Sequence, residues 1–415
     1  MIRTAEPGPG QRVTDFHQHW QQLNDWLVKY QTFWRPVPFM EPEPAWCHQY
    51  PELAGWLDHL ADDDCDYLAD HLAEFAQNAA IFVPELKLYR ELVDLPVLAL
   101  ESEAHQATLP ETHAVDMPGR KRLQAGAFAA AVLPSTGPVL DWCCGKGHLA
   151  RTLTGQGAEP VLGFEWDPEL VADGNRLADR YGDPVRLQHQ DVMAKNVQWP
   201  GRACQGVALH ACGDLHRQLL QVGSAAQAPR LSLSPCCYQR TEARSYQPLS
   251  QRASACGRSL ILDRSELKLA VQETVTAPAR VRKQTARISA WRLGFDALQR
   301  HLRGTDDYLP VPSHPTRLNN GDFEQFCRWA AQKKKLDLPA ALDWQHWLNK
   351  GERRLQQVRR HELLRHLFRR PLELVLVLDY GMFLEEQGYE VRLGTFCERS
   401  LTPRNLLLDA VRVAS

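Results

Sequence analysis

Between residues 139 and 238 the chain alternates short apolar runs with segments of helical periodicity. Such alternation predicts strands joined by helices, because buried parallel strands are continuous apolar runs and helices repeat their apolar face every turn. Five strands are expected, ending near Leu140, Phe164, His189, Leu209 and Leu233. Helices are expected between them, notably over 148–154 and 168–181. The pattern therefore predicts an α/β fold built on a doubly wound parallel sheet.

The segments on either side of this core follow other patterns. Apolar residues at three- and four-residue spacing predict helices near 16–30, 53–60 and 68–79. Residues 240–370 are mostly helical in pattern, whereas Leu372–Leu378 and Tyr389–Phe396 have the composition of buried strands. We therefore expect a helical N-terminal domain (1–115), a Rossmann-like core (116–239), a largely helical insertion (240–370) and final strands that complete the core sheet (371–415).

A glycine-rich turn joins the first expected strand to the first expected helix of the core. It runs Asp141-x-Cys143-x-Gly145-x-Gly147, and Glu165 ends the second strand 20 residues beyond Gly145. Glycine lets the backbone pass close to a ligand, and a carboxylate at this distance binds ribose hydroxyls in nucleotide-type folds. The third glycine of the dinucleotide pattern is missing. S-adenosylmethionine, which carries no phosphate, is favoured over NAD or FAD, with a plain α/β turn as the alternative.

Polar side chains follow the ends of several core strands. Because the carboxyl ends of parallel strands share one edge of a sheet, we expect Asp141, Glu165, Asp191, His210 and Cys236 on one rim. The residues expected to bind the cofactor are Asp141, Cys143, Gly145, Gly147, Glu165, Trp166, Asp191, Val192 and His210.

Methyl transfer requires an aligned acceptor and often the removal of one proton. His210 follows the fourth strand and is the first candidate for a base or a positioning group, with a purely structural histidine as the alternative. Asp214 is a further candidate, although capping of the next helix would also explain it. Cys236 and Tyr238 follow the fifth strand, and Tyr238 could stack on a planar acceptor such as a nucleobase.

Five of the eleven cysteines are expected to converge on this rim: Cys143, Cys144, Cys212, Cys236 and Cys237. Three interpretations are open. The thiols could line an apolar pocket, act as a redox or nucleophilic group, or bind zinc. Pocket lining is favoured, and no metal is expected. Two adjacent cysteine pairs are poor disulfide partners, which indicates reduced thiols and a cytoplasmic protein.

The net charge of −2 conceals a strong asymmetry along the chain. Residues 1–118 carry an excess of 14 acidic side chains, and residues 240–370 carry an excess of 13 basic ones. The basic segment suggests an RNA-binding surface. Alternatively, and to the same degree, its basic side chains could form ion pairs with the acidic residues of 1–118. No apolar run is long enough to span a membrane, and the first residues, MIRTAEPGPG, show no secretion signal.

Four sequence motifs together resemble a family of class I S-adenosylmethionine-dependent methyltransferases. They are DWCCGKGHLARTL, GVALHACGDL, LSLSPCCYQR and LTPRN at Leu401–Asn405. The family includes the methyltransferase-like proteins of the 25 type, the glutathione-transferase-C-terminal-domain-containing protein and, more distantly, the CHHC-zinc-finger tRNA 2′-O-methyltransferases. The resemblance covers about 116–240 and 371–410, and it implies a seven-stranded, mostly parallel Rossmann-like sheet.

The resemblance also assigns roles to individual positions. It implies that Asp141, Gly145 and Gly147 form the cofactor loop, that Glu165 holds the ribose, and that Asp191 lies near the adenine. The chain departs from the family at three places. Cys143 stands where many methyltransferases have glycine, and Gln124 stands where a Met-x-Pro-Lys-Lys-x-x-Glu element has glutamate. Cys47, His48, His59 and Cys65 do not have the spacing of the zinc finger.

These observations predict a cytoplasmic S-adenosylmethionine-dependent methyltransferase that acts on RNA, either tRNA or rRNA, gripped by residues 240–370. Two alternatives remain. The basic segment could bind an acidic protein, which would make the chain a protein methyltransferase. The chain could also be a cofactor-binding module without catalysis, because it lacks a DPPY-type catalytic tetrad.

Overall fold

The structure is a computed structural model that describes residues 15–135, 137–158, 160–257, 260–272 and 279–413. The first ten residues, in which we expected no secretion signal, lie outside the described residues. Among the helices that the structure describes, none is both long and apolar enough to cross a membrane.

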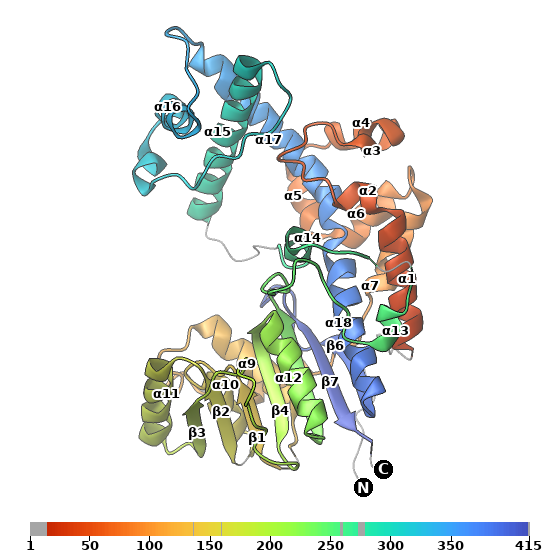
Figure 1. The fold of residues 1–415 in the computed structure, drawn as a ribbon, viewed down its shortest axis with the longest axis vertical. Coiled ribbons are helices and arrows are strands. Elements are labelled where there is room, and N and C mark those ends of the chain that lie inside the picture. Colours follow the sequence, from red (N-terminus) through yellow and green to blue (C-terminus); the bar gives the residue numbers. More distant parts are fainter. Residues whose placement is uncertain (1–14, 136, 159, 258–259, 273–278, 414–415) are drawn as a thin grey trace. The chain divides into compact units, whose positions relative to one another are not determined.

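Seven strands form a single sheet in the order β3-β2-β1-β4-β5-β7-β6 (Figure 1). The first five run parallel to one another, whereas β7 pairs antiparallel with both β5 and β6. The strands are β1 Val139–Trp142, β2 Val161–Glu165, β3 Val185–His189, β4 Gln205–Cys212, β5 Arg230–Cys236, β6 Tyr389–Thr395 and β7 Leu406–Arg412. The predicted α/β class with a doubly wound, mostly parallel sheet is confirmed.

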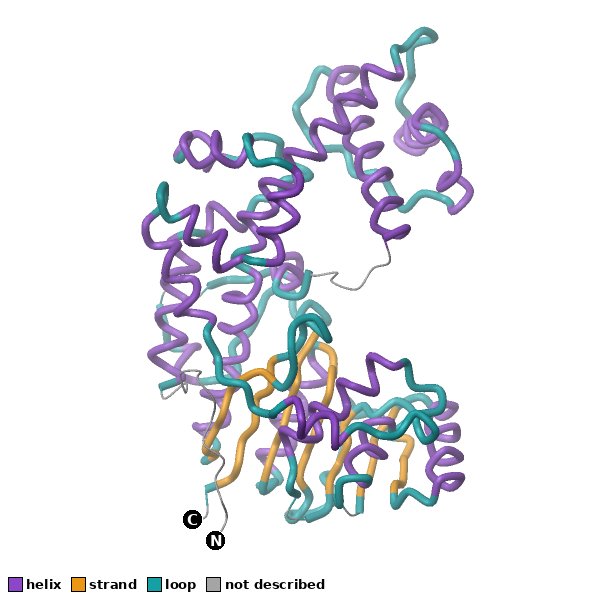
Figure 2. Tube along the Cα trace, turned by 180° about the vertical axis from the view of Figure 1, so that it is seen from behind, coloured by secondary structure: helices purple, strands orange, loops and turns teal. Residues whose placement is uncertain are grey.

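Helices cover the sheet, as the tube view from behind also shows (Figure 2). Helices α9 (Gly119–Val132) and α10 (His148–Thr154) pack together in an apolar cluster with β1 and β2. Helix α11 (Pro168–Tyr181) packs on β3, and α12 (Asp214–Ala225) packs on β4 and β5. Each parallel crossover thus places its helix against the sheet and the loop between strand and helix at the carboxyl edge, where ligands bind in such folds.

The expectation of a strand at Leu372–Leu378 is wrong. The segment lies inside α18 (Arg369–Glu386), and all seven of its residues are buried. A helix that is buried on all sides has no polar face, so its sequence lacks the usual periodicity and resembles a buried strand. The two buried acids of the helix, Glu373 and Asp379, both accept hydrogen bonds from other parts of the chain. For example, Asp379 accepts hydrogen bonds from the backbone N–H groups of Leu249 and Ser250 at 2.7 and 3.0 Å.

The chain divides into two compact units. The first contains residues 1–28, 91–275 and 369–415, which include the sheet, and the second contains residues 29–90 and 276–368. Much of the expected N-terminal domain therefore groups with the expected insertion. The remaining helices are α1 Phe16–Lys29, α2 Gln31–Trp34, α3 Ala45–Gln49, α4 Pro51–Asp58, α5 Asp62–Asp70, α6 Leu72–Ala79, α7 Tyr89–Val93, α8 Glu101–Ala107, α13 Gln251–Ser254, α14 Arg264–Leu269, α15 Ala279–Arg303, α16 Phe323–Lys334 and α17 Trp344–His366, with 3₁₀ turns at Pro84–Leu88 and Thr316–Asn320.

Candidate active site

The turn between β1 and α10 has a backbone shape that ordinary residues avoid. Cys143, Gly145 and Gly147 have φ angles of 59°, 57° and 68°, in the left-handed region. Glycine adopts this region freely, whereas a side chain at Cys143 costs about 1–2 kcal/mol. Cysteine at this position therefore keeps the glycine-like turn. The strain remains in the loop, as is common at functional sites.

Asp141 ties this turn to the helix that follows. Its buried carboxylate accepts a hydrogen bond from the backbone N–H of Ala150 at 3.1 Å, which satisfies one of the free donors in the first turn of α10. Burial raises the pKa of Asp141 to about 7, while the Ala150 bond lowers it and the nearby charge of Glu165 raises it further. Asp141 is thus fixed beneath the loop rather than exposed to solvent.

Glu165 holds the same loop from the end of β2. One carboxylate oxygen accepts a hydrogen bond from Gly145 N at 2.9 Å, and the other accepts from Trp166 N and Asp167 N at 3.0 and 3.1 Å. A Cβ built on Gly145 would meet nothing within 4 Å, so the space beside the loop is open. The neighbouring Trp166 is 71% exposed. Glu165 is thus buried against the backbone of the loop, next to an exposed aromatic ring.

Asp191 and Val192 follow β3 at the same edge of the sheet. Asp191 is exposed and its carboxylate accepts from Met193 N at 2.9 Å, whereas Val192 is buried. The backbone of the preceding residue, Gln190, is bonded to the carbonyl of Glu165 at 2.8 Å. The ends of β2 and β3 thus bring a buried carboxylate, an exposed indole and an exposed carboxylate to one edge of the sheet.

His210 interrupts β4 with a second strained turn. Its φ is 64°, and the pairing of β4 with β5 shifts register between Leu209 and Cys212. The side-chain nitrogen of Gln124 donates to the carbonyl of Leu401 at 3.0 Å, so the Gln124 oxygen is the atom that meets His210 Nε2 at 3.1 Å. His210 therefore carries its proton on Nε2 and keeps a lone pair on Nδ1.

The surroundings of His210 keep it uncharged at neutral pH. Burial, together with the positive charges of Arg404 and Lys121, lowers its pKa to about 4. A neutral imidazole with a fixed tautomer is suited to accept a hydrogen bond from a substrate. Gln124 was noted in the sequence only as a departure from a motif. Its pairing with His210 joins positions 86 residues apart, which local patterns do not reveal.

Two of the expected catalytic residues, Tyr238 and Asp214, make contacts that stabilise the fold. Tyr238 is buried, its hydroxyl donates to Glu373 at 3.3 Å, and its ring packs edge-on against His216. Stacking of Tyr238 on an acceptor therefore conflicts with this arrangement, because the ring already lies in the core. Asp214 is the first residue of α12 rather than its cap, and it accepts a hydrogen bond from Glu242 N at 2.9 Å.

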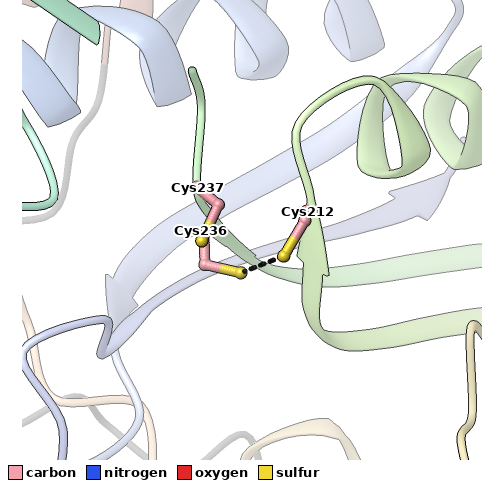
Figure 3. Close-up of side chains that lie close together, drawn as sticks. All are labelled: Cys212, Cys236 and Cys237. Carbon is pink, nitrogen blue, oxygen red and sulfur yellow. Dashed lines mark hydrogen bonds between the residues drawn. The ribbon is translucent and has the colours of Figure 1, made fainter. Parts of the chain in front are cut away.

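The structure brings together three of the five expected rim cysteines. The sulfur atoms of Cys212, Cys236 and Cys237 lie within 4.8 Å of one another. Cys212 and Cys236 are register partners at the ends of β4 and β5, and Figure 3 shows their sulfurs turned toward each other, 3.4 Å apart. Cys143 and Cys144 stay outside this group, in the loop after β1.

Comparison with known proteins finds methyltransferases. Residues 130–244 match a family described as a methyltransferase domain. The chain is similar to an rRNA methylase from Streptococcus thermophilus, with 17% identity over 26% of this chain and 66% of that chain and a TM-score of 0.21. It is similar to the glycopeptide N-methyltransferase MtfA complexed with S-adenosylmethionine, with 20% identity over 30% of this chain and 54% of that chain and a TM-score of 0.23.

The 23S rRNA methyltransferase ErmE is 14% identical, over 58% of this chain and 96% of that chain, with a TM-score of 0.23. At these TM-scores the likenesses carry no argument about substrate. The family match spans the strained loop after β1, the acidic end of β2 and the His210 turn, on a seven-stranded sheet. Residues 130–244 therefore match a methyltransferase domain and contribute β1 to β5 of a Rossmann-like class I sheet, and the enzyme is an S-adenosylmethionine-dependent methyltransferase.

Proposed function

We propose that this enzyme methylates RNA, with tRNA or rRNA as the substrate class. The observation that carries the proposal is the neutral His210 with two cationic side chains, Arg404 and Lys121, close enough to act on its charge. Arg404 and Lys121 both act on the pKa of His210, and Arg240 acts on that of the adjacent Cys237. Positive charge around a neutral acceptor-binding group suits a polyanionic substrate, because phosphates supply the counter-charge without protonating the histidine.

The chemistry assigned to each group follows from its contacts. When bound, S-adenosylmethionine supplies an electrophilic methyl group to the lone pair of the acceptor atom. Glu165 and the loop that it anchors hold the ribose side of that molecule. His210 accepts a hydrogen bond at Nδ1 from the acceptor hydroxyl or amine. This bond orients the attacking lone pair, and Nδ1 takes up the proton that the acceptor loses.

The basic charge of the second unit is partly neutralised within that unit. On α17, Arg359 lies 3.9 Å from Asp62 and also pairs with Asp66, and Arg360 lies 3.9 Å from Asp62. On this helix, basic side chains therefore pair with acidic residues of the N-terminal region, as the alternative to RNA binding supposed. The start of α15 differs, because Arg282 and Lys283 are exposed and form no ion pair with any residue that the structure describes. The start of α15 is the better candidate for phosphate contacts.

We also propose that the chain is a member of the methyltransferase-like 25 type. The sequence motifs at His210 and Leu401 support this assignment. A cytoplasmic location is proposed as well. It is supported by the eleven cysteines, all of which are free thiols, as a reducing compartment would keep them.

The decisive experiment is transfer of a labelled methyl group from S-adenosylmethionine to fractionated cell RNA and protein. We expect label in RNA, and Lys121→Ala combined with Arg240→Ala should weaken RNA binding in a salt-dependent way. Arg202→Ala, an exposed change before β4, is the matched control. Label in a protein band would instead support a protein methyltransferase. Cofactor binding without acceptor-dependent turnover would support a binding module.

A further inference from the structure

The cluster of Cys212, Cys236 and Cys237 is not used by the proposed methyl transfer. Its three sulfurs lie within 4.8 Å of one another, and the Cys212–Cys236 pair is 3.4 Å apart. Tetrahedral zinc with bonds of about 2.3 Å holds its thiolate sulfurs roughly 3.8 Å apart. Three sulfurs at these separations can therefore reach one zinc ion with small side-chain movements.

The backbone holds this grouping in place. Cys212 and Cys236 end neighbouring parallel strands as register partners, with the irregular turn at His210 just before Cys212. Cys237 has a φ of 46°, in the left-handed region, so its side chain departs from the alternation of β5. A regular strand would direct Cys236 and Cys237 to opposite faces of the sheet. The strained conformation accompanies the placement of both sulfurs beside Cys212.

The contacts of Cys236 show where its proton lies. Its thiol donates to the carbonyl oxygen of His210 at 3.1 Å, and the sulfur of Cys212 lies 3.4 Å away. A divalent ion would displace the thiol protons, so metal binding at this site should release protons.

We propose that Cys212, Cys236 and Cys237 form a thiolate site for Zn²⁺ at the carboxyl edge of the sheet. Within the part of the chain that the structure describes, no fourth histidine, cysteine or acidic ligand atom joins the group. Three protein ligands leave one position of a tetrahedral ion for water or a substrate atom, which is the composition of reactive rather than purely structural zinc sites. Zinc binding at this site does not require that the methyl acceptor is RNA.

The first test requires no variant. Protein purified under reducing conditions without chelators should contain one zinc per chain by elemental analysis. After removal of zinc, titration with Co²⁺ alone should produce a thiolate-to-cobalt charge-transfer band that saturates at one ion. Alkylation followed by peptide mapping should show Zn²⁺ protecting Cys212, Cys236 and Cys237 and no other cysteine.

Variants then assign the ligands individually. Cys212→Ser and Cys237→Ser should each weaken Co²⁺ binding by more than the roughly 10- to 100-fold that loss of an outer-shell partner causes. Cys256→Ser, a half-buried cysteine outside the cluster, should leave Co²⁺ binding unchanged. Circular dichroism of each variant establishes that it is folded, and the alkylation result holds for the wild type even where a variant fails to fold.

Three outcomes would overturn the proposal. The first is wild-type protein that takes up neither zinc nor cobalt when fully reduced. The second is protection of cysteines other than these three. The third is a Cys212–Cys236 disulfide in protein isolated without oxygen or added oxidant, which would assign the pair a redox role instead. None of these results depends on methyl transfer, so the site and the proposed function can fail separately.

Discussion

The side-chain oxygen of Gln124 meets the Nε2 atom of His210 at 3.1 Å, and the amide nitrogen of the same Gln124 is bonded to the Leu401 carbonyl at 3.0 Å. This double contact links α9, the irregular turn within β4 and the loop before β7. It fixes the tautomer of the histidine, and an amide oxygen adds no negative charge that would stabilise an imidazolium as a carboxylate would.

Replacing Gln124 with glutamate should therefore change the pH profile of methyl transfer. In the wild type the pKa of His210 lies near 4, so its protonation should cause no change in kcat/KM between pH 6 and 8. The carboxylate of Gln124→Glu should raise the pKa of His210, so that the imidazole becomes charged and inactive as pH falls toward 6. An acidic limb should then appear in the profile.

The matched control is Gln124→Met, which removes the amide without adding charge. It should lower activity without creating the acidic limb. A limb near pH 6.5 that is already present in the wild type and lost in His210→Ala would contradict the assigned neutral state of His210.

Asp141 makes the stability of the fold depend on pH. Its pKa is raised in the folded state to about 7, so the folded form holds the proton longer than the unfolded chain does. Stability from this group is full below its ordinary pKa near 4 and is lost as pH rises toward 7. Asp141→Asn removes the loss of stability at high pH, because an amide does not ionise. It also keeps an oxygen that can accept the hydrogen bond from Ala150 N.

Urea unfolding at pH 5 and pH 8 measures this effect. The advantage of Asp141→Asn over the wild type should be larger at pH 8 by about 2–3 kcal/mol. An equal difference at the two pH values would mean that Asp141 ionises normally in the folded state.

The strand-rich half of the molecule was largely predictable from the sequence. The five parallel strands each begin and end within a few residues of their expected positions, and the helix over 168–181 has the expected bounds. Alternating apolar runs and helical periodicity are local signals, so they survive in a single sequence. The segment at Leu372–Leu378 was misassigned because a helix buried on every side leaves no such signal.

The site was predictable only where strand ends could be located. Glu165, Asp191 and His210 lie at the carboxyl edge as the parallel topology requires. The orientation of side chains at that edge was not predictable, because it depends on strained backbone turns and on contacts distant in sequence. Tyr238 points into the core toward Glu373, 135 residues away, and no local pattern indicates that direction.

Glu165 should be essential for binding of the cofactor product. Glu165→Gln keeps the shape but places an amide donor against backbone N–H groups that now donate to the carboxylate, such as Gly145 N at 2.9 Å. Binding of S-adenosylhomocysteine, measured by isothermal titration, should weaken at least about tenfold, or roughly 1.4 kcal/mol. Glu169→Gln, an exposed change in the first turn of α11, should bind as the wild type does. Unchanged affinity of a folded Glu165→Gln would refute the cofactor loop as assigned.

Charge reversal on α15 distinguishes phosphate contacts from solvated surface charge. Arg282 and Lys283 are exposed near the start of that helix, whereas Arg359 and Arg360 on α17 already face acidic partners. Arg282→Glu with Lys283→Glu should weaken RNA binding and reduce the slope of log K against log salt by about 2, one for each lost phosphate contact. Measurement of RNA affinity across a range of salt concentrations reports both quantities.

The control for this pair is Lys87→Glu with Arg90→Glu, which makes the same change in net charge at two exposed positions outside the basic segment. A general electrostatic effect would weaken RNA binding equally in both double variants. Direct contact by α15 predicts a loss in the first double variant only, because counterion release depends on phosphates neutralised locally rather than on total charge. Equal salt slopes in the two variants would therefore exclude α15 as the RNA-binding element, while leaving the methyltransferase domain itself untouched.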